Sequence, residues 1–312
     1  MALDTQRSSF LNGFDPGEPE PKEMSWTVER ASQILIGGEL SVHRLGFGAM
    51  RLSTNGFRGP PRNPAIGHSV LRRAIRLGIN LIDTADFYQS IDGSVRANTL
   101  IREALYPYPS SLVIATKVGP VFQADGSHRP GTEADMRRLV EDNLRSLGVE
   151  RLDLVYLRIG HMVPPAGESL AKRFEALALL REEGLVGHLG LSNVTTAHLA
   201  EALSIAPVAA VQNRFNIAKR DDIAMVKVCE KNGIAFCPFS PIGGGATNID
   251  ADSLAGIARR HSATPLQIAL AWLLSCSPIT VAIPGAGSIA HLEENFVAGS
   301  ILLSREDFAK LA

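Results

Sequence analysis

The sequence predicts an α/β fold, namely a (β/α)8 TIM barrel with a β-hairpin at its N-terminal side. Eight short apolar segments alternate with amphipathic helical patterns along the chain. They lie at residues 45–48, 80–83, 112–115, 152–157, 188–191, 210–212, 234–236 and 279–283. Parallel strands need crossover helices and are covered on both faces, so this alternation indicates a parallel sheet. A count of eight favours a closed barrel, which holds about 250 residues in one domain.

Two segments precede the first barrel strand. Residues 1–32 are polar and contain several prolines but little periodicity, so we expect a flexible tail there. Residues 34–42 hold two short apolar stretches around Gly37 and Gly38. This is a hairpin pattern, because glycine supplies the positive φ values of a tight turn. The expected organisation is a tail at 1–32 and a single barrel domain at 33–312.

Capping residues delimit two of the expected helices. Thr132 precedes apolar residues at helical spacing, and Gly148 follows them, so a helix is predicted between these two positions. Thr264-Pro265-Leu266-Gln267 combines a capping box with a proline in the first helical turn. The apolar run at 268–274 then predicts a well-buried helix.

The first barrel strand does not lead into a Rossmann dinucleotide site. Gly46-Phe47-Gly48 is followed by Ala49-Met50-Arg51, so the third glycine of the Gly-x-Gly-x-x-Gly pattern is absent. A closed barrel therefore fits the sequence better than an open, doubly wound sheet.

The composition narrows the class of protein. The 31 basic and 32 acidic side chains nearly cancel, so charge gives no reason to expect nucleic acid or a membrane as partner. No apolar run reaches the ~18 residues that span a bilayer, and the first residues carry no secretion signal. The three cysteines lack metal-ligand spacing and are too few to staple the chain. We expect a cytoplasmic protein with reduced thiols and no metal site.

Polar residues recur where the predicted strands end. Asp83 and Lys117 each close an apolar run, and Tyr88 lies in the loop five positions after Asp83. Other strand ends carry Arg158, Ser192-Asn193, Gln212 and Ser240. The carboxyl ends of barrel strands meet at one mouth, where function gathers. A carboxylate, an ammonium and a phenol at that mouth shift one another's pKa values, which indicates chemistry rather than packing.

In their order along the chain, several motifs resemble those of the aldo-keto reductases. They are Gly46-Phe47-Gly48, Asp83-Thr84-Ala85-Asp86-Phe87-Tyr88, Thr116-Lys117, Gly190-Leu191-Ser192-Asn193, Val211-Gln212-Asn213 and Ile283-Pro284-Gly285. The resemblance covers residues 33–312, and the set of motifs is highly specific. It implies that the hairpin at 34–42 closes the N-terminal mouth of the barrel. It also implies reduction of a carbonyl by a nicotinamide cofactor.

The resemblance gives Tyr88 the role of general acid in carbonyl reduction and of base in the reverse direction. A free phenol has a pKa of about 10, which suits neutral pH poorly. A neighbouring ammonium favours the phenolate, so Lys117, held by Asp83, would lower that pKa. A lone strand-end Asp or loop Tyr is often structural, but the three residues together favour catalysis.

Arg158 departs from the family pattern, which usually has a histidine at this strand end. Arginine stays charged at neutral pH and cannot donate a proton. It can donate forked hydrogen bonds to a carbonyl or carboxylate. We expect Arg158 to polarise the substrate carbonyl or to bind an anionic or phenolic substituent. The alternative is a salt-bridged arginine with no part in turnover.

The resemblance also implies which residues bind the cofactor. Ser192, Asn193 and Gln212 would hold the nicotinamide carboxamide, and Phe239 would stack beneath the ring. Contacts to the pyrophosphate and adenosine would come from Ser240, Ile242, Gly244, Ser288, His291, Glu294 and Asn295. Ser288 starts a helix whose N-terminus suits a phosphate, although serine is equally an ordinary helix cap.

NADPH is the favoured cofactor, with NADH as the alternative. Family members specific for NADPH often place Lys and Arg where this chain has Gly285 and His291. A neutral histidine at position 291 weakens any argument for strong selectivity for the 2′-phosphate.

The substrate is expected to be a small carbonyl compound. Gly59-Pro60-Pro61-Arg62, residues 101–108, Asn193-Val194-Thr195 and Arg158 resemble a bacterial branch of the family that includes pyridoxal reductases. Pyridoxal carries an aldehyde beside a phenolate, which an arginine would suit. The competing function is a nicotinamide-binding regulatory barrel that senses redox state with little turnover. A phosphate-binding isomerase barrel would explain neither the Asp-Tyr-Lys set nor the Ser-Asn-Gln set.

Overall fold

The computed structural model describes residues 33–54, 59–122, 127–160, 164–165, 167–244 and 250–311. The tail predicted at 1–32 lies outside the described residues. Among the described residues, no helix combines the length and the apolar character needed to cross a membrane.

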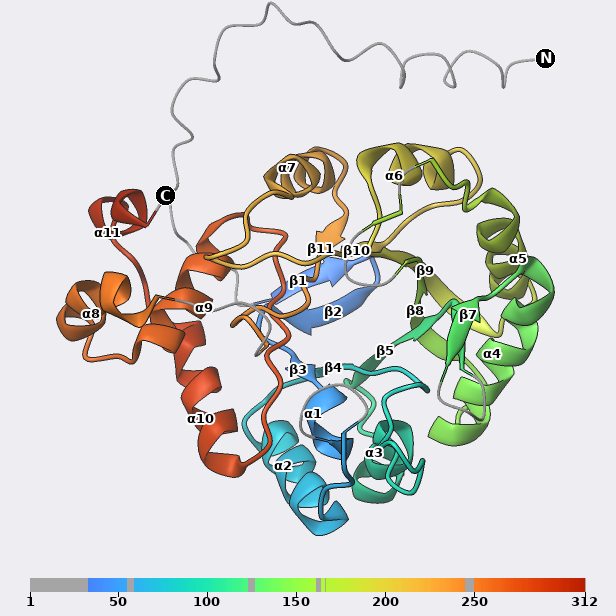
Figure 1. Cartoon of the computed structure of the whole chain (residues 1–312), viewed down its shortest axis with the longest axis horizontal. Helices are drawn as coiled ribbons and strands as arrows, with labels where there is room; N and C mark the ends of the chain where they lie inside the picture. Colours follow the sequence, from blue (N-terminus) through green and yellow to red (C-terminus); the bar gives the residue numbers. More distant parts are fainter. Residues whose placement is uncertain are drawn as a thin grey trace, which may run out of the picture. The chain divides into compact units, whose positions relative to one another are not determined.

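Seven parallel strands curve around a common core in the order β3-β4-β5-β8-β9-β10-β11 (Figure 1). They are β3 (Phe47–Gly48), β4 (Leu81–Asp83), β5 (Val113–Val118), β8 (Leu152–Arg158), β9 (Val186–Ser192), β10 (Ala210–Gln212) and β11 (Ala235–Phe236). Their register brings strand ends level with one another, since Ser192 pairs with both Arg158 and Gln212. Most of the residues predicted for the site therefore stand at one mouth of the barrel.

The eighth predicted strand closes the ring through isolated bridges rather than a continuous ladder. Thr280 bridges Phe236 of β11, and Ala282 bridges Leu45, both in parallel orientation. Val281 N donates to Phe236 O at 2.9 Å, and Ala282 N donates to Arg44 O at 2.8 Å. The barrel that the sequence predicts is confirmed, with its closing strand reduced to these contacts.

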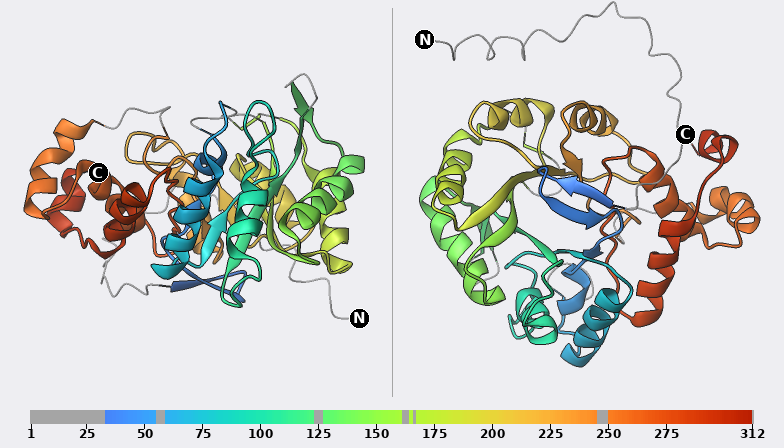
Figure 2. Two further views of the ribbon diagram at one scale, coloured as in Figure 1. Left: turned by 90° about the horizontal axis from the view of Figure 1, so that it is seen from below. Right: turned by 180° about the vertical axis from the view of Figure 1, so that it is seen from behind.

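The predicted hairpin is confirmed as β1 (Gln33–Ile36) and β2 (Leu40–His43), paired antiparallel. Gly37 and Gly38 have φ values of +61° and +78°, as the turn requires. Ile36 and Val42 are fully buried in a core cluster inside the barrel. His43 N donates to Asn80 Oδ1, just before β4, so the hairpin covers the N-terminal ends of the strands. Figure 2 shows it lying across that end of the ring.

Helices surround the barrel and bury a larger apolar cluster against the outer faces of the strands (Figure 2). The helices are α1 (Met50–Ser53), α2 (Pro64–Arg76), α3 (Ala97–Leu105), α4 (Glu133–Leu147), α5 (Ala171–Glu182), α6 (Thr196–Leu203), α7 (Ile223–Lys231), α8 (Ala251–Arg260), α9 (Pro265–Ser275), α10 (Ile289–Val297) and α11 (Arg305–Lys310), with a 3₁₀ turn at Ala298–Ser300. Both capping predictions are confirmed. Thr132 caps α4, which Gly148 ends in the left-handed conformation, and Thr264 forms the capping box of the buried α9.

A second hairpin, which the sequence did not predict, follows β5. Its strands β6 (Pro120–Phe122) and β7 (His128–Pro130) pair antiparallel. The Phe122 ring lies 5.5 Å from that of Phe87 and 5.1 Å from that of His128, measured between centroids. These contacts hold the hairpin beside the loop that carries Tyr88.

Candidate active site

A buried ion pair forms the centre of the site. Lys117 Nζ lies 2.6 Å from Asp83 Oδ1, and Lys117 also donates to the carbonyl of Thr84 at 2.9 Å. Gln212 Nε2 donates to the other carboxylate oxygen of Asp83 at 2.7 Å. The ends of β4, β5 and β10 are thus joined through Asp83, and both of its oxygens have partners.

The charge on Lys117 is stabilised by its neighbours. Burial opposes that charge, but the carboxylate of Asp83 and then the phenol of Tyr88 outweigh burial and raise the pKa of Lys117. Lys117 is 1% exposed, so solvent does little to screen these interactions. The ammonium is therefore a fixed cation at neutral pH.

Tyr88 lies directly over that ammonium. Lys117 Nζ is 4.8 Å from the centroid of the Tyr88 ring. The ring of Phe87 meets the Tyr88 ring edge to face, with centroids 5.3 Å apart. The backbone of Tyr88 is held as well, since Tyr88 N donates to Ala85 O and Ala97 N donates to Tyr88 O. The structure thus brings Asp83, Lys117 and Tyr88 together.

Arg158 is the last residue of β8 and points across to the next strand end. Its Nη1 donates to Ser192 Oγ at 3.0 Å, and its Cζ lies 5.0 Å from the centroid of the Phe239 ring. Burial lowers the pKa of Arg158, while the charges of Tyr88 and Asp83 act in the opposite direction. An arginine keeps its charge despite such a shift, so this side of the site is also cationic.

A small cavity of about 60 Å³ adjoins Arg158. Its walls are Gly119, Pro120, His128, Arg129, Pro130, Arg158, Ile159, Gly160 and Arg173. Sequence reasoning missed this cavity, because the hairpin β6–β7 that forms one wall consists of strands too short to show a periodic pattern.

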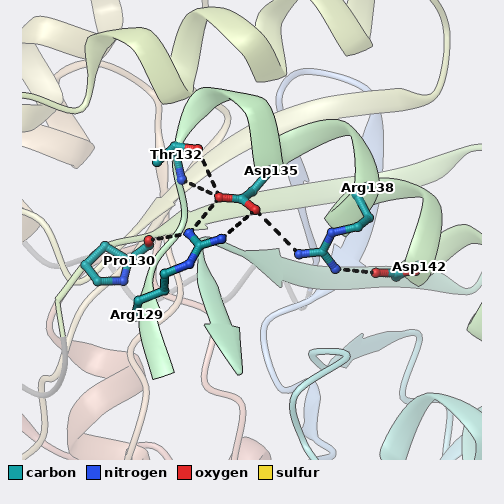
Figure 3. Close-up of polar contacts among 6 residues, drawn as sticks. All are labelled: Arg129, Pro130, Thr132, Asp135, Arg138 and Asp142. Carbon is teal, nitrogen blue, oxygen red and sulfur yellow. Dashed lines mark hydrogen bonds and ion pairs between the residues drawn. The ribbon is translucent and has the colours of Figure 1, made fainter. Parts of the chain in front are cut away.

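The other two arginines of the cavity are paired with carboxylates. Arg129 makes two hydrogen bonds to Asp135, at 2.8 and 3.0 Å, and Arg138 links Asp135 to Asp142 (Figure 3). Arg173 Nη2 donates to Glu168 Oε1 at 2.8 Å. Their charges are therefore largely balanced within the chain, whereas the charge of Arg158 acts on Tyr88 and Asp83.

The three residues predicted for the carboxamide lie side by side on adjacent strand ends. Asn193 has a φ of +62°, and its side chain donates to Ile159 O at 2.8 Å. Asn193 N donates to Gln212 O at 3.0 Å. Gln212 Oε1 is buried and has no hydrogen-bond partner among the described residues. The amide edge of Gln212 thus offers a buried acceptor beside the Ser192 hydroxyl.

The segment after β11 carries the next predicted residues. Phe239 extends that strand, because its N donates to Asn213 O at 2.9 Å. Ser240 has a φ of +55°, and its carbonyl accepts from Asn216 Nδ2 at 2.9 Å. Ile242 is half-buried against the core, and Gly244 has a φ of +59°. The described part of this loop, up to Gly244, therefore directly follows the end of β11.

The residues predicted for the adenosine end form a separate group on α10. Ser288 caps this helix by accepting from His291 N at 3.2 Å, and His291 itself is exposed. Glu294 accepts from Thr264 Oγ1 at 2.8 Å. Asn295 is buried and directs its side-chain amide to Gly285 O at 3.5 Å. The carboxylate of Glu294 and the amide of Asn295 thus already have partners within the chain.

Known proteins resemble the chain in sequence and in fold. The profile of the aldo/keto reductase family matches residues 44–312. The chain is 46% identical over 279 residues to pyridoxine 4-dehydrogenase of Escherichia coli K12, covering 88% of this chain and 95% of that protein. It is 40% identical over 276 residues to an uncharacterized oxidoreductase of Schizosaccharomyces pombe, covering 88% and 87%.

Two solved structures also resemble the chain. A thermostable aldo-keto reductase in complex with the inhibitor epalrestat superposes with a TM-score of 0.76 at 30% identity, over 89% of this chain and 98% of that one. An aldo-keto reductase from Klebsiella pneumoniae in complex with NADPH superposes with a TM-score of 0.74 at 25% identity, over 90% and 93%. The chain therefore belongs to the aldo/keto reductase family and is an oxidoreductase acting on carbonyl and CH–OH groups.

Proposed function

We propose that this protein is an NADPH-dependent carbonyl reductase whose substrates include pyridoxal, with Tyr88 as the general acid. The observation that carries the proposal is the buried Asp83–Lys117 pair beneath the Tyr88 ring. Such a pair costs desolvation energy and is weak support for stability alone. A charged lysine beneath a phenol, at the mouth of a barrel, can instead stabilise the phenolate that remains when the phenol donates its proton.

The residues at the strand ends suit a nicotinamide ring. The partnerless Gln212 Oε1 is a buried acceptor, and a carboxamide N–H is the kind of donor it lacks. Ser192 and Asn193 lie beside it and supply further polar atoms. Arg158 lies over the ring of Phe239, the aromatic side chain proposed to stack beneath the nicotinamide. When bound, the cofactor supplies the hydride.

The chain's own residues handle the proton. Tyr88 donates its phenolic proton to the developing alkoxide, and the phenolate that remains faces the ammonium of Lys117. Because the pKa of Lys117 is raised, this lysine keeps its own proton and acts as a stabilising charge. Asp83 holds Lys117 in place through the 2.6 Å contact. Arg158 adds a second cation that cannot release a proton.

Pyridoxal is proposed as a substrate on two grounds. The E. coli relative at 46% identity is named pyridoxine 4-dehydrogenase, an activity whose reverse direction reduces pyridoxal. Arg158 stands in the wall of the small cavity, where a guanidinium would pair with a phenolate next to the aldehyde. NADPH is preferred to NADH because a relative of similar fold was solved in complex with NADPH.

A cytoplasmic location is part of the same proposal. Cys229, Cys237 and Cys276 are free thiols, and burial raises the pKa of each to about 12. Thiols of this kind are poor nucleophiles and suit a reducing compartment.

The test follows oxidation of NADPH and NADH by absorbance, with pyridoxal and a panel of other carbonyl compounds. The Tyr88→Phe variant should lose about 10²- to 10⁴-fold in kcat while binding the cofactor normally. Tyr106→Phe is the matched control, since Tyr106 is 60% exposed and lies between the end of α3 and the start of β5. Tight cofactor binding without turnover of any carbonyl would instead favour the regulatory barrel. A wild-type protein that binds neither cofactor would refute both functions.

A further inference from the structure

Two arginines between β3 and α2, near the start of the barrel, contact loops that come late in the sequence. Arg51, in α1, donates from Nη2 to the carbonyl of Gly244 at 2.7 Å. Arg62, just before α2, donates from Nη2 to the carbonyl of Gly287 at 2.6 Å. Gly244 follows β11, and Gly287 follows the segment that closes the ring. Both guanidinium groups are therefore at the mouth formed by the carboxyl ends of the strands.

The glycines of the closing loop leave the space that these side chains fill. A Cβ atom on Gly285 would lie 3.2 Å from Arg51 Cγ. A Cβ atom on Gly287 would lie 2.6 Å from Arg62 Nη1, which is too close for the observed arrangement. The loop itself, residues 284–291, contains no lysine or arginine. The permanent positive charge beside this loop thus comes from another part of the chain.

The carbonyl contact of Arg51 leaves the charge of that side chain only partly satisfied. A carbonyl oxygen accepts one N–H but does not neutralise a guanidinium, which has five donors in a planar fork. In the described parts of the chain, no carboxylate lies within ion-pair distance of Arg51. Both arginines are half-buried, so water screens their charge less than at an open surface. Guanidinium groups in such positions suit the bidentate recognition of phosphate.

We propose that Arg51 and Arg62 bind the phosphates of the dinucleotide, Arg51 the pyrophosphate and Arg62 the 2′-phosphate that distinguishes NADPH from NADH. The proposal rests on the proposed function, which places the nicotinamide ring at Ser192, Gln212 and Phe239. Gly244 belongs to the same loop as Phe239, so Arg51 stands nearer the ring. Gly287 belongs to the closing loop and adjoins α10, so Arg62 stands farther along the mouth, at the adenosine end.

The assignment makes the two arginines behave differently toward the two cofactors. The pyrophosphate is common to NADPH and NADH, so Arg51→Met should weaken both by the same factor. The 2′-phosphate occurs only in NADPH, so Arg62→Met should weaken NADPH alone. A lost hydrogen bond to a charged group is worth about 1.5–3 kcal/mol, which corresponds to a change in Kd of about 10- to 100-fold.

Dissociation constants from isothermal titration calorimetry test this without relying on turnover. NADPH and NADH are titrated into the wild type, Arg51→Met, Arg62→Met and Arg62→Lys, with 2′,5′-ADP and 5′-ADP as shorter probes. Arg76→Met is the matched control, because Arg76 is an exposed arginine on α2. Arg62→Met should lose affinity for NADPH and 2′,5′-ADP by about tenfold or more and keep its affinity for NADH. Arg62→Lys should lie between the wild type and Arg62→Met.

The outcomes separate this proposal from the proposed function. If the wild type binds NADPH tightly and Arg62→Met binds it as well as Arg76→Met does, the role of Arg62 is refuted while the reductase function stands. Equal losses of NADPH and NADH in Arg62→Met would also refute recognition of the 2′-phosphate. If the wild type binds neither dinucleotide, both proposals fail. Circular dichroism of each variant shows whether an affinity loss comes from misfolding.

Discussion

Lys117 Nζ lies 2.6 Å from Asp83 Oδ1, with the lysine side chain 1% and the carboxylate side chain 6% exposed. The two residues end or nearly end neighbouring strands, β4 and β5, whose parallel register pairs Asp83 with Ala115. The register of the two strands therefore determines this contact, and the two side chains keep little conformational freedom. A buried pair of this kind is costly to break, because the remaining charge stays buried without its ion-pair partner.

Removing one member of this pair should destabilise the fold. Asp83→Asn leaves the Lys117 ammonium buried without its carboxylate, and Lys117→Met leaves the carboxylate with only Gln212 as a strong donor. Each single change should cost about 3–5 kcal/mol in free energy of unfolding. Asp83→Asn combined with Lys117→Met should cost less than the sum, since no lone charge remains. Equilibrium unfolding in urea measures all three.

An exposed pair serves as the control for that experiment. Arg137 and Glu183 form an ion pair whose side chains are 51% and 47% exposed. Glu183→Gln should leave the urea midpoint almost unchanged, because solvent screens such pairs. If the two single changes at the buried pair simply add in the double variant, Asp83 and Lys117 do not depend on each other as described.

The strand-end residues were predictable because barrel geometry brings them together. Asp83 and Lys117 each follow an apolar run, and side chains at the carboxyl ends of parallel strands converge whatever the loops do. The contacts of Arg51 and Arg62 were not predictable, because they join residues 193 and 225 positions apart through irregular loops. The hairpin β6–β7 was missed for another reason. Strands of three residues are too short for an alternating pattern to stand out.

Arg158→Met should weaken reduction of pyridoxal more than that of an uncharged aliphatic aldehyde. Methionine keeps an apolar stem over the Phe239 ring but removes the guanidinium that adjoins the cavity. The loss of a charge-assisted hydrogen bond should lower kcat/KM for pyridoxal by about 10- to 100-fold. Lysine keeps the charge but not the forked donors of a guanidinium. The kcat/KM of Arg158→Lys for pyridoxal should therefore lie between the values of the wild type and Arg158→Met. Steady-state kinetics with both aldehydes measure the difference.

Arg129→Met is the matched variant for Arg158, because Arg129 lines the same cavity but is paired with Asp135. Its effect on kcat/KM for pyridoxal should be small by comparison. Unchanged efficiency of Arg158→Met toward pyridoxal would show that Arg158 has no part in turnover or substrate binding, as in the salt-bridge alternative.

Gly148→Ala should destabilise the protein more than Gly78→Ala. Both glycines have φ values in the left-handed region, +71° and +89°, where a Cβ atom costs about 1–2 kcal/mol. A Cβ on Gly148 would also lie 2.8 Å from Arg102 Nε, whereas nothing lies within 4 Å of one on Gly78. Arg102 donates to Arg145 O, so moving it disturbs the end of α4. Thermal unfolding followed by circular dichroism should show the larger drop in Tm for Gly148→Ala. Equal drops in Tm for the two variants would mean that the Arg102 side chain moves aside without a cost in stability.

Asp86 should make the stability of the fold depend on pH. Burial, and then the charge of Asp142, raise the pKa of Asp86 from 3.8 to about 7, against the opposing effects of the Phe87 backbone N–H, Arg138 and Arg96. Its Oδ1 is buried and has no hydrogen-bond partner among the described residues. The carboxyl group lines a cavity of about 380 Å³ with Arg96, Asn98, Asp142, Arg145 and Ser146.

The sign of the effect follows from the raised pKa. Well below pH 3.8 the carboxyl group is protonated in both the folded and the unfolded chain, so it imposes no cost. As pH rises from about 4 to about 7, the unfolded chain releases this proton more readily, and stability falls. Asp86→Asn stays neutral throughout, so it should match the wild type near pH 4 and exceed it at pH 8, by at most about 4 kcal/mol.

Urea unfolding of the wild type and Asp86→Asn at several pH values between 4 and 8 measures this difference. Asp92→Asn is a suitable comparison, because hydrogen bonds from Ser90 and Ser94 lower the pKa of Asp92. That variant should gain no stability relative to the wild type as pH rises. A constant difference between Asp86→Asn and the wild type across the range would mean that Asp86 does not titrate near neutrality. The carboxyl group would then be ionised in the folded protein at all these pH values, stabilised by Arg96 and Arg138.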